Sequence, residues 1–392
     1  ARVVRDFINA LNEFGKKVYL LTSSEIDYKK IEEYHGPIKI EKLYQPTGWR
    51  KEFCKEETLS RIFMKKEFQE MAKEVDFIID VDGRIFDKYL PKNFDRNKYI
   101  VWRVSCAKRD TKKFTFMKLG LKRKIKELIK DFLYTKGNLP AKNIKIYPLD
   151  EWTKKEIIDY WNLEPEDLCL YAEIKVDHFL REKAKKKNQI IVFGRIAPNK
   201  MMDDSIKIFA EGVKEFPNYN LVIMGGITPD SEKYIIELKD LIKKLNIENK
   251  VKIIPNPSFG ELKKILLESE ILIDSQWGTS HTMTAMEGLA AGNIILVHKY
   301  SGTYTEILDN GKYGFGFNNN KEGAEKLEEI IKGIKDKKIN GEKFRKRAKY
   351  YSGEKFRKRL KEILKIRVAL EKPNSLNKNS TKNTLNLEDK SK

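Results

Sequence analysis

The sequence predicts an α/β protein of two domains, each built on a parallel β-sheet, and three observations support this. Short apolar runs alternate with amphipathic helical segments over most of the chain, which is typical of parallel sheets with crossover helices. The alternation falls into two series, separated by the basic stretch LREKAKKKN at 180–188. With 392 residues, the chain is long enough for two domains that each bury a core.

The first series begins with a helix. In residues 2–14 the apolar side chains share one helical stripe, and Gly15 stands where a glycine commonly ends a helix. Buried strands are predicted over 17–23, 75–83, 98–104 and 142–148. Because a parallel α/β domain usually opens on a strand, we expect a first strand and its loop to precede Ala1.

The second series runs from 190 to about 335. Strands are predicted over 190–194, 220–226, 250–256, 270–276 and 293–298, and helices over 203–216, 231–247, 259–269, 284–292 and 321–334. Each strand ends on a loop that can face one crevice, where open α/β sheets bind ligands. A basic helical stretch is expected after 340, to about 370, and the polar remainder is expected to be disordered.

The composition is that of a water-soluble protein, with 40% hydrophobic and 35% charged residues. No apolar run approaches the ~20 residues that a bilayer span needs, and no signal peptide is visible. The cysteines, Cys54, Cys106 and Cys169, are too few and too scattered for a disulfide framework or a zinc site. We therefore expect a reducing, cytoplasmic setting.

The net charge of +21 is concentrated in two segments. Residues 108–130 hold ten Lys and Arg against two acidic residues, and residues 342–367 hold twelve against three. Such a surface suits phosphates, nucleic acid or an anionic membrane. The alternative is a lysine-rich chain with solvated helix faces.

Two cations follow the first strand of the second series, in VFGRIAPNK (192–200). Arg195 offers a planar fork for phosphate oxygens, and Lys200 a mobile point charge. Five positions apart, in a loop that contains Pro198, they could hold one diphosphate from two sides. The alternative is that both are ordinary exposed loop cations.

A second loop with binding character is WGTSHTMTAMEGLAAG (277–292). A small polar run leads from Gly278 into a helix, and the amides of Thr282, Met283 and Thr284 at the helix start could form an anion site. Glu287, on the first turns, could accept two ribose hydroxyl protons, as acidic residues do in dinucleotide folds. Alternatively, its carboxylate only compensates the helix dipole.

The segments FGRIAPNK, VIMGG, MEGLAAG and SGTYTEIL occur in the order and approximate spacing of the family 4 retaining glycosyltransferases, which this chain resembles. Residues 190–335 carry most of the resemblance. Residues 1–23, DEWTKKEIIDYW (150–161) and YYSGEKFRKRLKEIL (350–364) resemble other parts of the same family. Its general character is similar to that of the mannosyltransferases that extend lipid-linked oligosaccharides.

The resemblance implies the GT-B fold, in which two Rossmann-like domains have parallel sheets that face a central cleft. Residues 1–183 would be the acceptor domain, without its first strand, and 188–340 the nucleotide-sugar donor domain. Residues 341–370 would form a basic helix that crosses back to the N-terminal domain, before a disordered tail over 371–392.

The resemblance also implies site residues. Arg195 and Lys200 match the cations that bind the donor diphosphate, and Glu287 matches the second carboxylate of a Glu-x7-Glu motif that holds the ribose. We assign the catalytic role to these three and expect no metal or other cofactor. The remaining donor-site candidates are Gly194, Gly225, Pro255, Thr279, His281, Thr282, Met283 and Thr284, and Arg103 lies on the acceptor side.

The sequence departs from the family pattern at two places. Thr279 occupies the position of the first glutamate of the motif, so the carboxylate expected near the donor sugar is absent. His281 could instead reach a sugar hydroxyl or phosphate, although a loop histidine satisfied by backbone is an equal alternative. The N-terminal half also lacks the histidine that many relatives place near the reacting centre, since the corresponding strand carries Arg103.

Three other features have weaker functional interpretations. Asp80 and Asp82 resemble a metal-binding Asp-x-Asp pair, but they end a strand of the N-terminal half, far in sequence from the diphosphate site. His178 is expected to pack near the domain hinge. Segment 114–133 combines apolar anchors with dense Lys and Arg, which is typical of helices that lie on anionic membranes and also of core helices with a basic face.

These observations lead to one hypothesis and two alternatives. The chain is expected to transfer a sugar, with mannose one candidate, from a nucleoside diphosphate donor to a glycan or polyprenol-linked acceptor with retention. It would act in the cytoplasm, with peripheral contact to the membrane. The alternatives are a degenerate GT-B protein that only binds sugar nucleotides, and a basic nucleic-acid-binding protein, for which no module is recognisable. A GT-B sugar-nucleotide epimerase explains the motifs less well.

Overall fold

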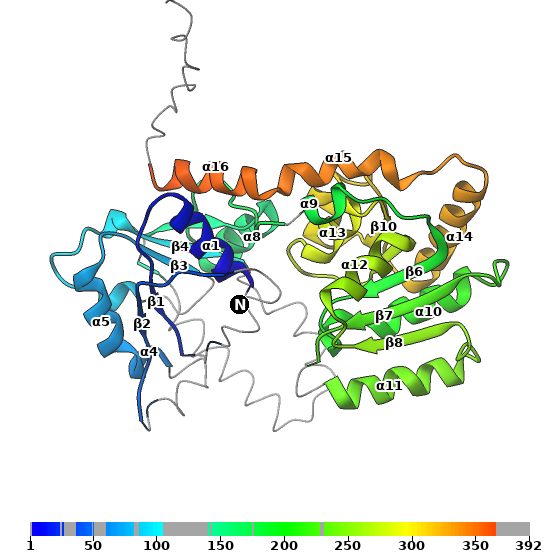
Figure 1. Cartoon of the computed structure of the whole chain (residues 1–392), viewed down its shortest axis with the longest axis horizontal. Coiled ribbons are helices and arrows are strands. Elements are labelled where there is room, and N and C mark those ends of the chain that lie inside the picture. Colours follow the sequence, from blue (N-terminus) through cyan, green and yellow to red (C-terminus); the bar gives the residue numbers. More distant parts are fainter. Residues whose placement is uncertain are drawn as a thin grey trace, which may run out of the picture.

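The computed structural model describes residues 2–23, 26, 37–48, 50, 60–81, 86–104, 140–141, 143–174, 176–227 and 231–365. These residues form two α/β units that lie side by side, with a helical segment from the C-terminal part of the chain running across both (Figure 1). The sequence-based prediction of an α/β fold with parallel sheets is confirmed.

The larger unit is built on a six-stranded sheet in the order β11-β10-β9-β6-β7-β8, and every neighbouring pair is parallel. Its strands are β6 (Lys187–Phe193), β7 (Asn220–Gly225), β8 (Val251–Pro255), β9 (Ser269–Asp274), β10 (Ile294–His298) and β11 (Phe315–Phe317). The chain runs from β6 to β8 on one side and then from β9 to β11 on the other. The order therefore reverses between β6 and β9, which is the position where open α/β sheets bind ligands.

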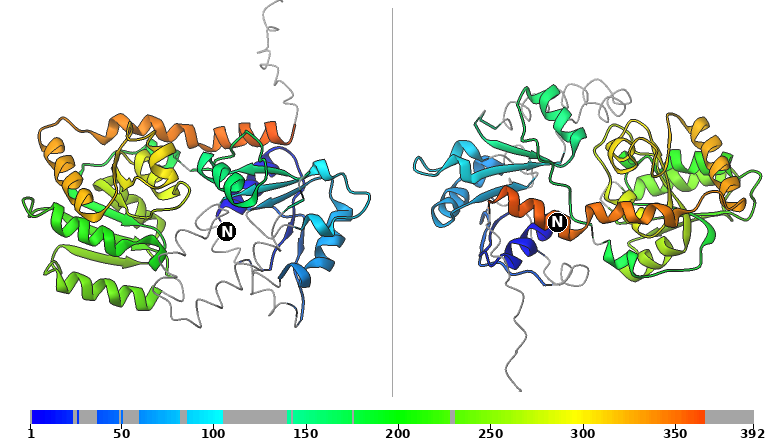
Figure 2. Two further views of the ribbon diagram at one scale, coloured as in Figure 1. Left: turned by 180° about the vertical axis from the view of Figure 1, so that it is seen from behind. Right: turned by 90° about the horizontal axis from the view of Figure 1, so that it is seen from above.

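Helices cover both faces of this sheet (Figure 2). One face holds α10 (Met202–Gly212), α11 (Ser231–Lys244) and α14 (Asn320–Lys335), and the other holds α9 (Asp177–Leu180), α12 (Phe259–Glu268) and α13 (Met283–Ala290). Successive strand residues alternate between the two cores: Ile190 and Val192 belong to the first, and Ile191 to the second. This period of two explains why the strands read as continuous apolar runs.

The smaller unit holds two short parallel sheets, β1-β2 and β3-β4-β5. Its strands are β1 (Tyr19–Leu21), β2 (Lys42–Tyr44), β3 (Ile78–Val81), β4 (Tyr99–Arg103) and β5 (Lys145–Pro148). Its helices are α1 (Arg2–Glu13), α4 (Ser60–Phe63), α5 (Lys65–Glu74) and α8 (Glu151–Glu156), which continues as a π-helical turn over Ile157–Trp161. The expected glycine after the first helix is confirmed, because Gly15 has a φ of +70°.

The C-terminal segment returns to the smaller unit. It comprises a 3₁₀ turn (Gly341–Phe344), α15 (Arg345–Ala348), a second 3₁₀ turn (Lys349–Tyr351) and α16 (Gly353–Ile363), so its described part is a broken series and not one helix from 341. Phe356 of α16 packs edge-on against Phe7 of α1, with ring centroids 5.2 Å apart. The guanidinium of Arg357 pairs with Glu13. This segment therefore joins the two units by both apolar and ionic contacts.

Sequence analysis missed the short strands β2 and β11. Each has three residues, too few to establish a period of two. Segment 114–133, the tail over 371–392, Asp82, Cys54 and Cys106 lie outside the described residues, so the interpretations given for them stay predictions. None of the described helices is long and apolar enough to span a membrane.

Candidate functional site

The crevice residues lie where β6, β7, β8 and β9 end. The backbone after β6 donates two hydrogen bonds to the end of β7 and the loop after it: Gly194 N donates to Met224 O at 3.1 Å, and Ile196 N donates to Gly226 O at 2.9 Å. Asn256 N, which follows Pro255 at the end of β8, donates to Gly225 O at 2.8 Å. Three of the predicted loops therefore form one connected rim.

Two positions of this rim require glycine, one because of close packing and the other because of its backbone conformation. A Cβ on Gly225 would lie 1.4 Å from the carbonyl oxygen of Gly194, which no side chain can tolerate. Gly194 itself has a φ of +146°, a conformation that L-residues rarely adopt. A Cβ built there would lie 3.9 Å from both Lys200 and Thr284, so these two side chains border the same point of the crevice.

Lys200 and Arg195 differ in their surroundings. Lys200 Nζ donates to the amide oxygen of Gln276 at 2.7 Å, which connects the loop after β6 to the loop after β9. Burial lowers the pKa of Lys200, and the nearby Arg195 lowers it further, although Asp274 opposes both effects. Arg195 is exposed and makes no hydrogen bond or ion pair with another residue of the described part of the chain. The two cations are close enough to repel, which an anion between them would relieve.

The start of α13 faces the same crevice. Thr282 Oγ1 donates to Asp274 Oδ2 at 2.7 Å, which fixes the loop before the helix. The Thr282 N–H, however, donates to Thr303 Oγ1 at 2.9 Å. This contact removes the Thr282 amide from the anion donors expected at the helix start and leaves those of Met283 and Thr284. Glu287 lies one turn further along α13 and is only 6% exposed.

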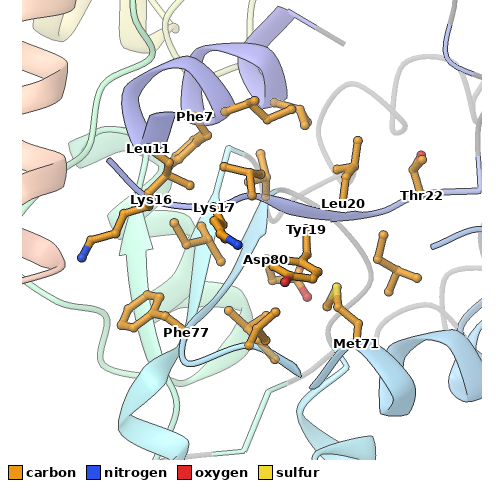
Figure 3. A pocket seen from close by; sticks show the side chains of 18 of the residues that line it. Phe7, Leu11, Lys16, Lys17, Tyr19, Leu20, Thr22, Met71, Phe77 and Asp80 are labelled. Carbon is orange, nitrogen blue, oxygen red and sulfur yellow. The ribbon is translucent and has the colours of Figure 1, made fainter. Parts of the chain in front are cut away.

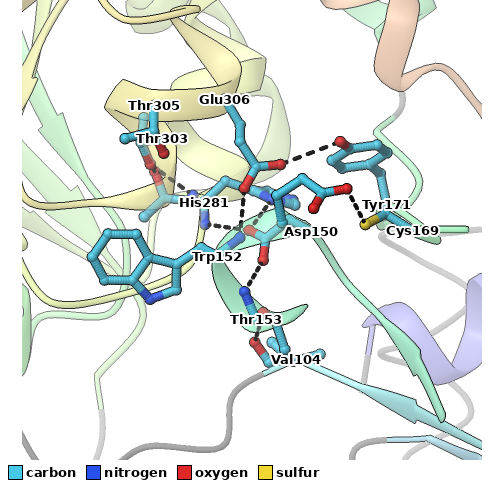
Figure 4. A network of polar contacts seen from close by, with 12 residues as sticks. Val104, Asp150, Trp152, Thr153, Cys169, Tyr171, His281, Thr303, Thr305 and Glu306 are labelled. Atoms are coloured by element: carbon cyan, nitrogen blue, oxygen red, sulfur yellow. Dashed lines mark hydrogen bonds and ion pairs between the residues drawn. The ribbon is translucent and has the colours of Figure 1, made fainter. Parts of the chain in front are cut away.

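A second polar cluster lies beside this crevice, where the two units meet. We call it the interface network and define it by Asp150, Tyr171, His281 and Glu306 (Figure 4). Asp150 Oδ2 accepts a hydrogen bond from the His281 backbone N–H at 2.9 Å and lies 2.7 Å from His281 Nδ1. Its other oxygen caps α8 by accepting from Thr153 N at 2.8 Å. One carboxylate therefore fixes the start of a helix in the smaller unit and a loop of the larger one.

Asp150 and His281 are both buried. Burial raises the pKa of Asp150, but His281 lowers it by more, through its charge and its hydrogen bonds, so the net pKa lies below the ordinary value. His281 Nε2 is buried and has no hydrogen-bond partner among the described residues. The alternative stated for His281 was a loop histidine satisfied by backbone, but its ring nitrogen Nδ1 contacts the Asp150 carboxylate instead.

Glu306 extends the interface network. Its carboxylate accepts from the backbone N–H of Trp152 at 2.9 Å and from the hydroxyl of Tyr171 at 3.2 Å. Burial raises its pKa to about 7, and the negative charge of Asp150 acts in the same direction. Glu306 belongs to the segment SGTYTEIL, in a π-helical turn (Thr303–Ile307).

Aromatic rings enclose this network. The Tyr171 ring lies 5.6 Å from the His281 ring and 5.2 Å from Tyr351 of the C-terminal segment. The Arg359 guanidinium of α16 lies over the Tyr171 ring at 4.6 Å. The burial that shifts the pKa values of the interface network therefore comes from the smaller unit, the larger unit and the C-terminal segment together.

The remaining predicted residues make contacts with other parts of the protein. Arg103, at the end of β4, is buried with its guanidinium over the Trp161 ring at 5.0 Å. Asp80 accepts a hydrogen bond from the Tyr99 hydroxyl at 2.7 Å, and His178 packs edge-on against Phe259. Thr279 is half-buried, and its carbonyl oxygen accepts from Gly302 N at 2.8 Å. No group of three potential metal ligands occurs among the described residues.

Sequence analysis missed Asp150, Gln276 and Glu306. Asp150 precedes a helical run and carries the signal of an N-cap, but its contact with His281 spans 131 residues and leaves no local trace. Glu306 lies in SGTYTEIL, a segment that carries the family resemblance but does not by itself indicate a role for this glutamate. Only three-dimensional proximity identifies these residues.

Comparison with known proteins agrees with this geometry. Residues 174–355 match the family model for glycosyl transferases group 1. Over 168 residues the chain is 28% identical to the GDP-Man:Man(3)GlcNAc(2)-PP-Dol alpha-1,2-mannosyltransferase of Xenopus laevis. The matched region covers 40% of this chain and 34% of that relative. The chain thus matches about a third of the length of this curated relative.

Solved structures resemble a much larger part of the chain. A glycosyltransferase from Rickettsia africae superposes with a TM-score of 0.66 at 15% identity, covering 92% of this chain and 94% of its own. Alr3699/HepE of Anabaena, in complex with UDP and glucose, superposes with a TM-score of 0.64 at 12% identity, and the match covers 92% of this chain and 95% of that chain. The chain therefore has the GT-B fold, and its residues 174–355 match the group 1 glycosyl transferase model and are distantly similar in sequence to alpha-1,2-mannosyltransferases.

Proposed function

We propose that this protein transfers a sugar from a nucleoside diphosphate donor to a hydroxyl of a glycan or polyprenol-linked acceptor, with retention of configuration. The observation that carries the proposal is the arrangement at the end of β6. Lys200 and Thr284, at the start of α13, border one point where the strand order reverses, and Arg195 is close enough to Lys200 to affect its pKa. This arrangement suits a diphosphate.

The reaction exchanges one bond at the anomeric carbon. The bond to the diphosphate oxygen breaks, the bond to the acceptor oxygen forms, and negative charge accumulates on the departing nucleoside diphosphate. Arg195 and Lys200 would stabilise that charge, with the amides of Met283 and Thr284 as further donors. Glu287 would hold the ribose hydroxyls. With two cations in place, we propose that the diphosphate needs no metal ion.

The acceptor would lie against the smaller unit, where Arg103 ends β4. A lipid-linked acceptor is supported by the name of the Xenopus relative, which specifies a dolichol-linked glycan and a GDP-mannose donor. It is also supported by the net positive charge of segments 108–130 and 342–367, which would attract an anionic membrane surface from the cytoplasmic side. On this basis, mannose is the first sugar to test.

A second candidate function is favoured by Thr279. Because a threonine stands where the family has a carboxylate near the donor sugar, the crevice would bind a sugar nucleotide without transferring the sugar. The variant Thr279→Glu separates the two candidates. A chain that gains turnover only with the glutamate is a degenerate binder, whereas turnover by the wild type supports the transferase.

The experiment that tests the donor site measures thermal unfolding with a panel of nucleoside diphosphates and their sugars. A ligand at 100 times its Kd adds about 2.7 kcal/mol to the free energy of unfolding, which is visible as a rise in Tm. We expect a rise with one base, lost in Arg195→Ala and kept in Lys214→Ala, an exposed lysine of the same unit. If no diphosphate raises the Tm, the donor-site interpretation is wrong.

A further inference from the structure

A neutral side chain holds Lys200 in the crevice. The Lys200 Nζ donates to Gln276 Oε1 at 2.7 Å, and Gln276 is only 8% exposed. Because a lysine ammonium can only donate hydrogen bonds, the contact uses the amide oxygen and fixes the orientation of the Gln276 side chain. Among the described residues, no carboxylate forms an ion pair with Lys200. Lys200 is therefore held without being neutralised.

Gln276 is itself fixed by Asp274, the last residue of β9. The Gln276 backbone N–H donates to Asp274 Oδ1 at 3.2 Å. The other carboxylate oxygen, Oδ2, accepts from Thr282 Oγ1 at 2.7 Å, and Thr282 is the residue before α13. One carboxylate thus fixes both the residue that contacts Lys200 and the start of the helix, so the cation and the helix amides are arranged before a ligand binds.

A cation of the smaller unit is held in a different way. A cavity of about 910 Å³ lies there between α1 and α5, with Phe7 and Met71 in its lining (Figure 3). Lys17, which also lines this cavity, is exposed and pairs with the Glu41 carboxylate at 3.4 Å. The charge of Lys17 is compensated by an internal carboxylate, whereas Lys200 has a neutral amide as its acceptor.

We propose that Gln276 is a positioning residue of the donor site, whose neutral amide holds the Lys200 ammonium in place and leaves its charge to the diphosphate. This inference rests on the proposed function, because it assigns a role within the same crevice. A glutamate would make the same contact but would add a negative charge beside the phosphates, and an apolar side chain would remove the acceptor. A purely structural link between the two loops would be served by glutamate as well as by glutamine, and this difference can be tested.

The test compares two variants of Gln276 of similar size. Gln276→Glu keeps the acceptor and adds a negative charge, and Gln276→Met removes the acceptor. Asn220→Asp is the matched control, because it adds the same charge at an exposed position at the start of β7, the end away from the crevice. GDP and UDP are the probes, with affinity measured by calorimetry and the free energy of unfolding by urea.

For whichever diphosphate binds the wild type, we expect Gln276→Glu to weaken binding about 10- to 100-fold, comparable to the loss of one charge-assisted hydrogen bond, without loss of stability. Gln276→Met should weaken binding about 10-fold or less, because Lys200 keeps its charge but loses its fixed position. Asn220→Asp should bind as the wild type does.

The pH dependence of binding separates positioning from packing. Binding requires the charged form of Lys200, so affinity should fall as the pH rises through the pKa of Lys200, which burial lowers. This fall should move to higher pH in Gln276→Glu, where the added carboxylate favours the charged form, and to lower pH in Gln276→Met. The charged groups that act on Lys200, Asp274 and Arg195, are present in every variant. Competitive acetylation of Lys200 with acetic anhydride, followed by mass spectrometry, gives the same order without a nucleotide.

Failure of this inference and failure of the proposed function give different results. If a diphosphate binds the wild type but not Arg195→Ala, and both Gln276 variants match the wild type in affinity and pH profile, the donor site stands and the role of Gln276 is wrong. If neither GDP nor UDP binds the wild type, or if Arg195→Ala binds as the wild type does, the donor site is wrong and this inference falls with it. If Gln276→Glu does not fold, Gln276→Met decides: wild-type affinity together with an unchanged acetylation profile contradicts the role of Gln276.

Discussion

The crevice at the end of β6 and the interface network differ in how charged side chains are held. In the crevice, Arg195 is exposed, and Lys200 contacts a neutral amide. In the interface network, Asp150 and His281 are buried against each other. An exposed cation without an ionic partner, such as Arg195, is available to an external anion, whereas each member of a buried carboxylate–histidine pair already has its partner inside the protein. The crevice is therefore organised for a ligand, and the network for joining two units.

The largest expected effect tests the crevice side of this comparison. Arg195→Ala and Lys200→Ala should each reduce turnover about 100- to 1,000-fold, because each removes charge stabilisation from the departing diphosphate. Since Arg195 has no partner to lose within the described residues, the free energy of unfolding of Arg195→Ala should stay near that of the wild type. Steady-state rates and urea unfolding measure both quantities, with Lys214→Ala as the control. A wild-type rate in Arg195→Ala would contradict the assignment.

The second effect tests the network side. Asp150→Ala should lower the free energy of unfolding by about 3 kcal/mol, because His281 and the start of α8 lose their shared acceptor in a buried position. Asp167→Ala is the matched control, since the exposed Asp167–Lys154 pair should contribute less than about 1 kcal/mol. Equal losses in both variants, measured by urea unfolding, would show that Asp150 is only another surface charge.

The third effect tests how tightly the crevice rim is packed. Gly225→Ala should destabilise the protein by about 1–3 kcal/mol, because the new methyl group meets the Gly194 carbonyl. Gly226→Ala is the control one residue away, where the nearest atom to a new Cβ is 4.0 Å distant. Thermal unfolding and nucleotide affinity of both variants can be compared directly. If the two variants behave alike, the close approach of the two loops is not as described.

The fourth effect is a pH dependence in the interface network. The pKa of Glu306 is raised to about 7, so between its ordinary value and pH 7 the folded state binds more protons than the unfolded state. Stability from this group is thus present at low pH and lost as the pH rises through 7. The free energy of unfolding of the wild type should fall relative to that of Glu306→Gln over this range. A difference that does not vary with pH would refute this assignment of the buried acid.

Asp150 should act in the opposite sense and in a different window. Its pKa is lowered, so its stabilising effect is present above the ordinary carboxyl range and is lost as the pH falls through it. Tyr171 and Arg359 face the same network, but burial raises the pKa of Tyr171 above its ordinary value, so Tyr171 stays neutral over both windows.

The smallest expected effect concerns metal ions. If the two cations alone stabilise the diphosphate, a chelator such as EDTA should leave the nucleotide-induced rise in Tm unchanged, and added Mg²⁺ should not increase it. Measuring the rise with and without chelator tests this. A rise that requires Mg²⁺ would show that Arg195 and Lys200 do not suffice.

Sequence patterns predicted more of the fold than of the site. The apolar runs at 190–194 and 220–226 are buried strands, because a strand covered on both faces leaves an unbroken hydrophobic signal. The crevice loops were predictable as well, because the carboxyl ends of parallel strands lie at the same edge of the sheet. The Asp150–His281 pair was not predictable, because contacts between units depend on how two separately folded surfaces meet. The hydrogen bond from the Thr282 amide to Thr303 was also missed, because the two residues lie 21 positions apart and leave no local pattern.

The most direct test of the account measures two quantities, nucleoside diphosphate affinity and the free energy of unfolding, in Arg195→Ala and Asp150→Ala. We predict that one variant changes the affinity for the nucleotide and the other changes the free energy of unfolding. Arg195→Ala should lose the nucleotide and keep its stability, whereas Asp150→Ala should lose stability and, while folded, still bind the nucleotide. If Arg195→Ala binds the nucleotide as tightly as the wild type, the crevice at the end of β6 is not the donor site.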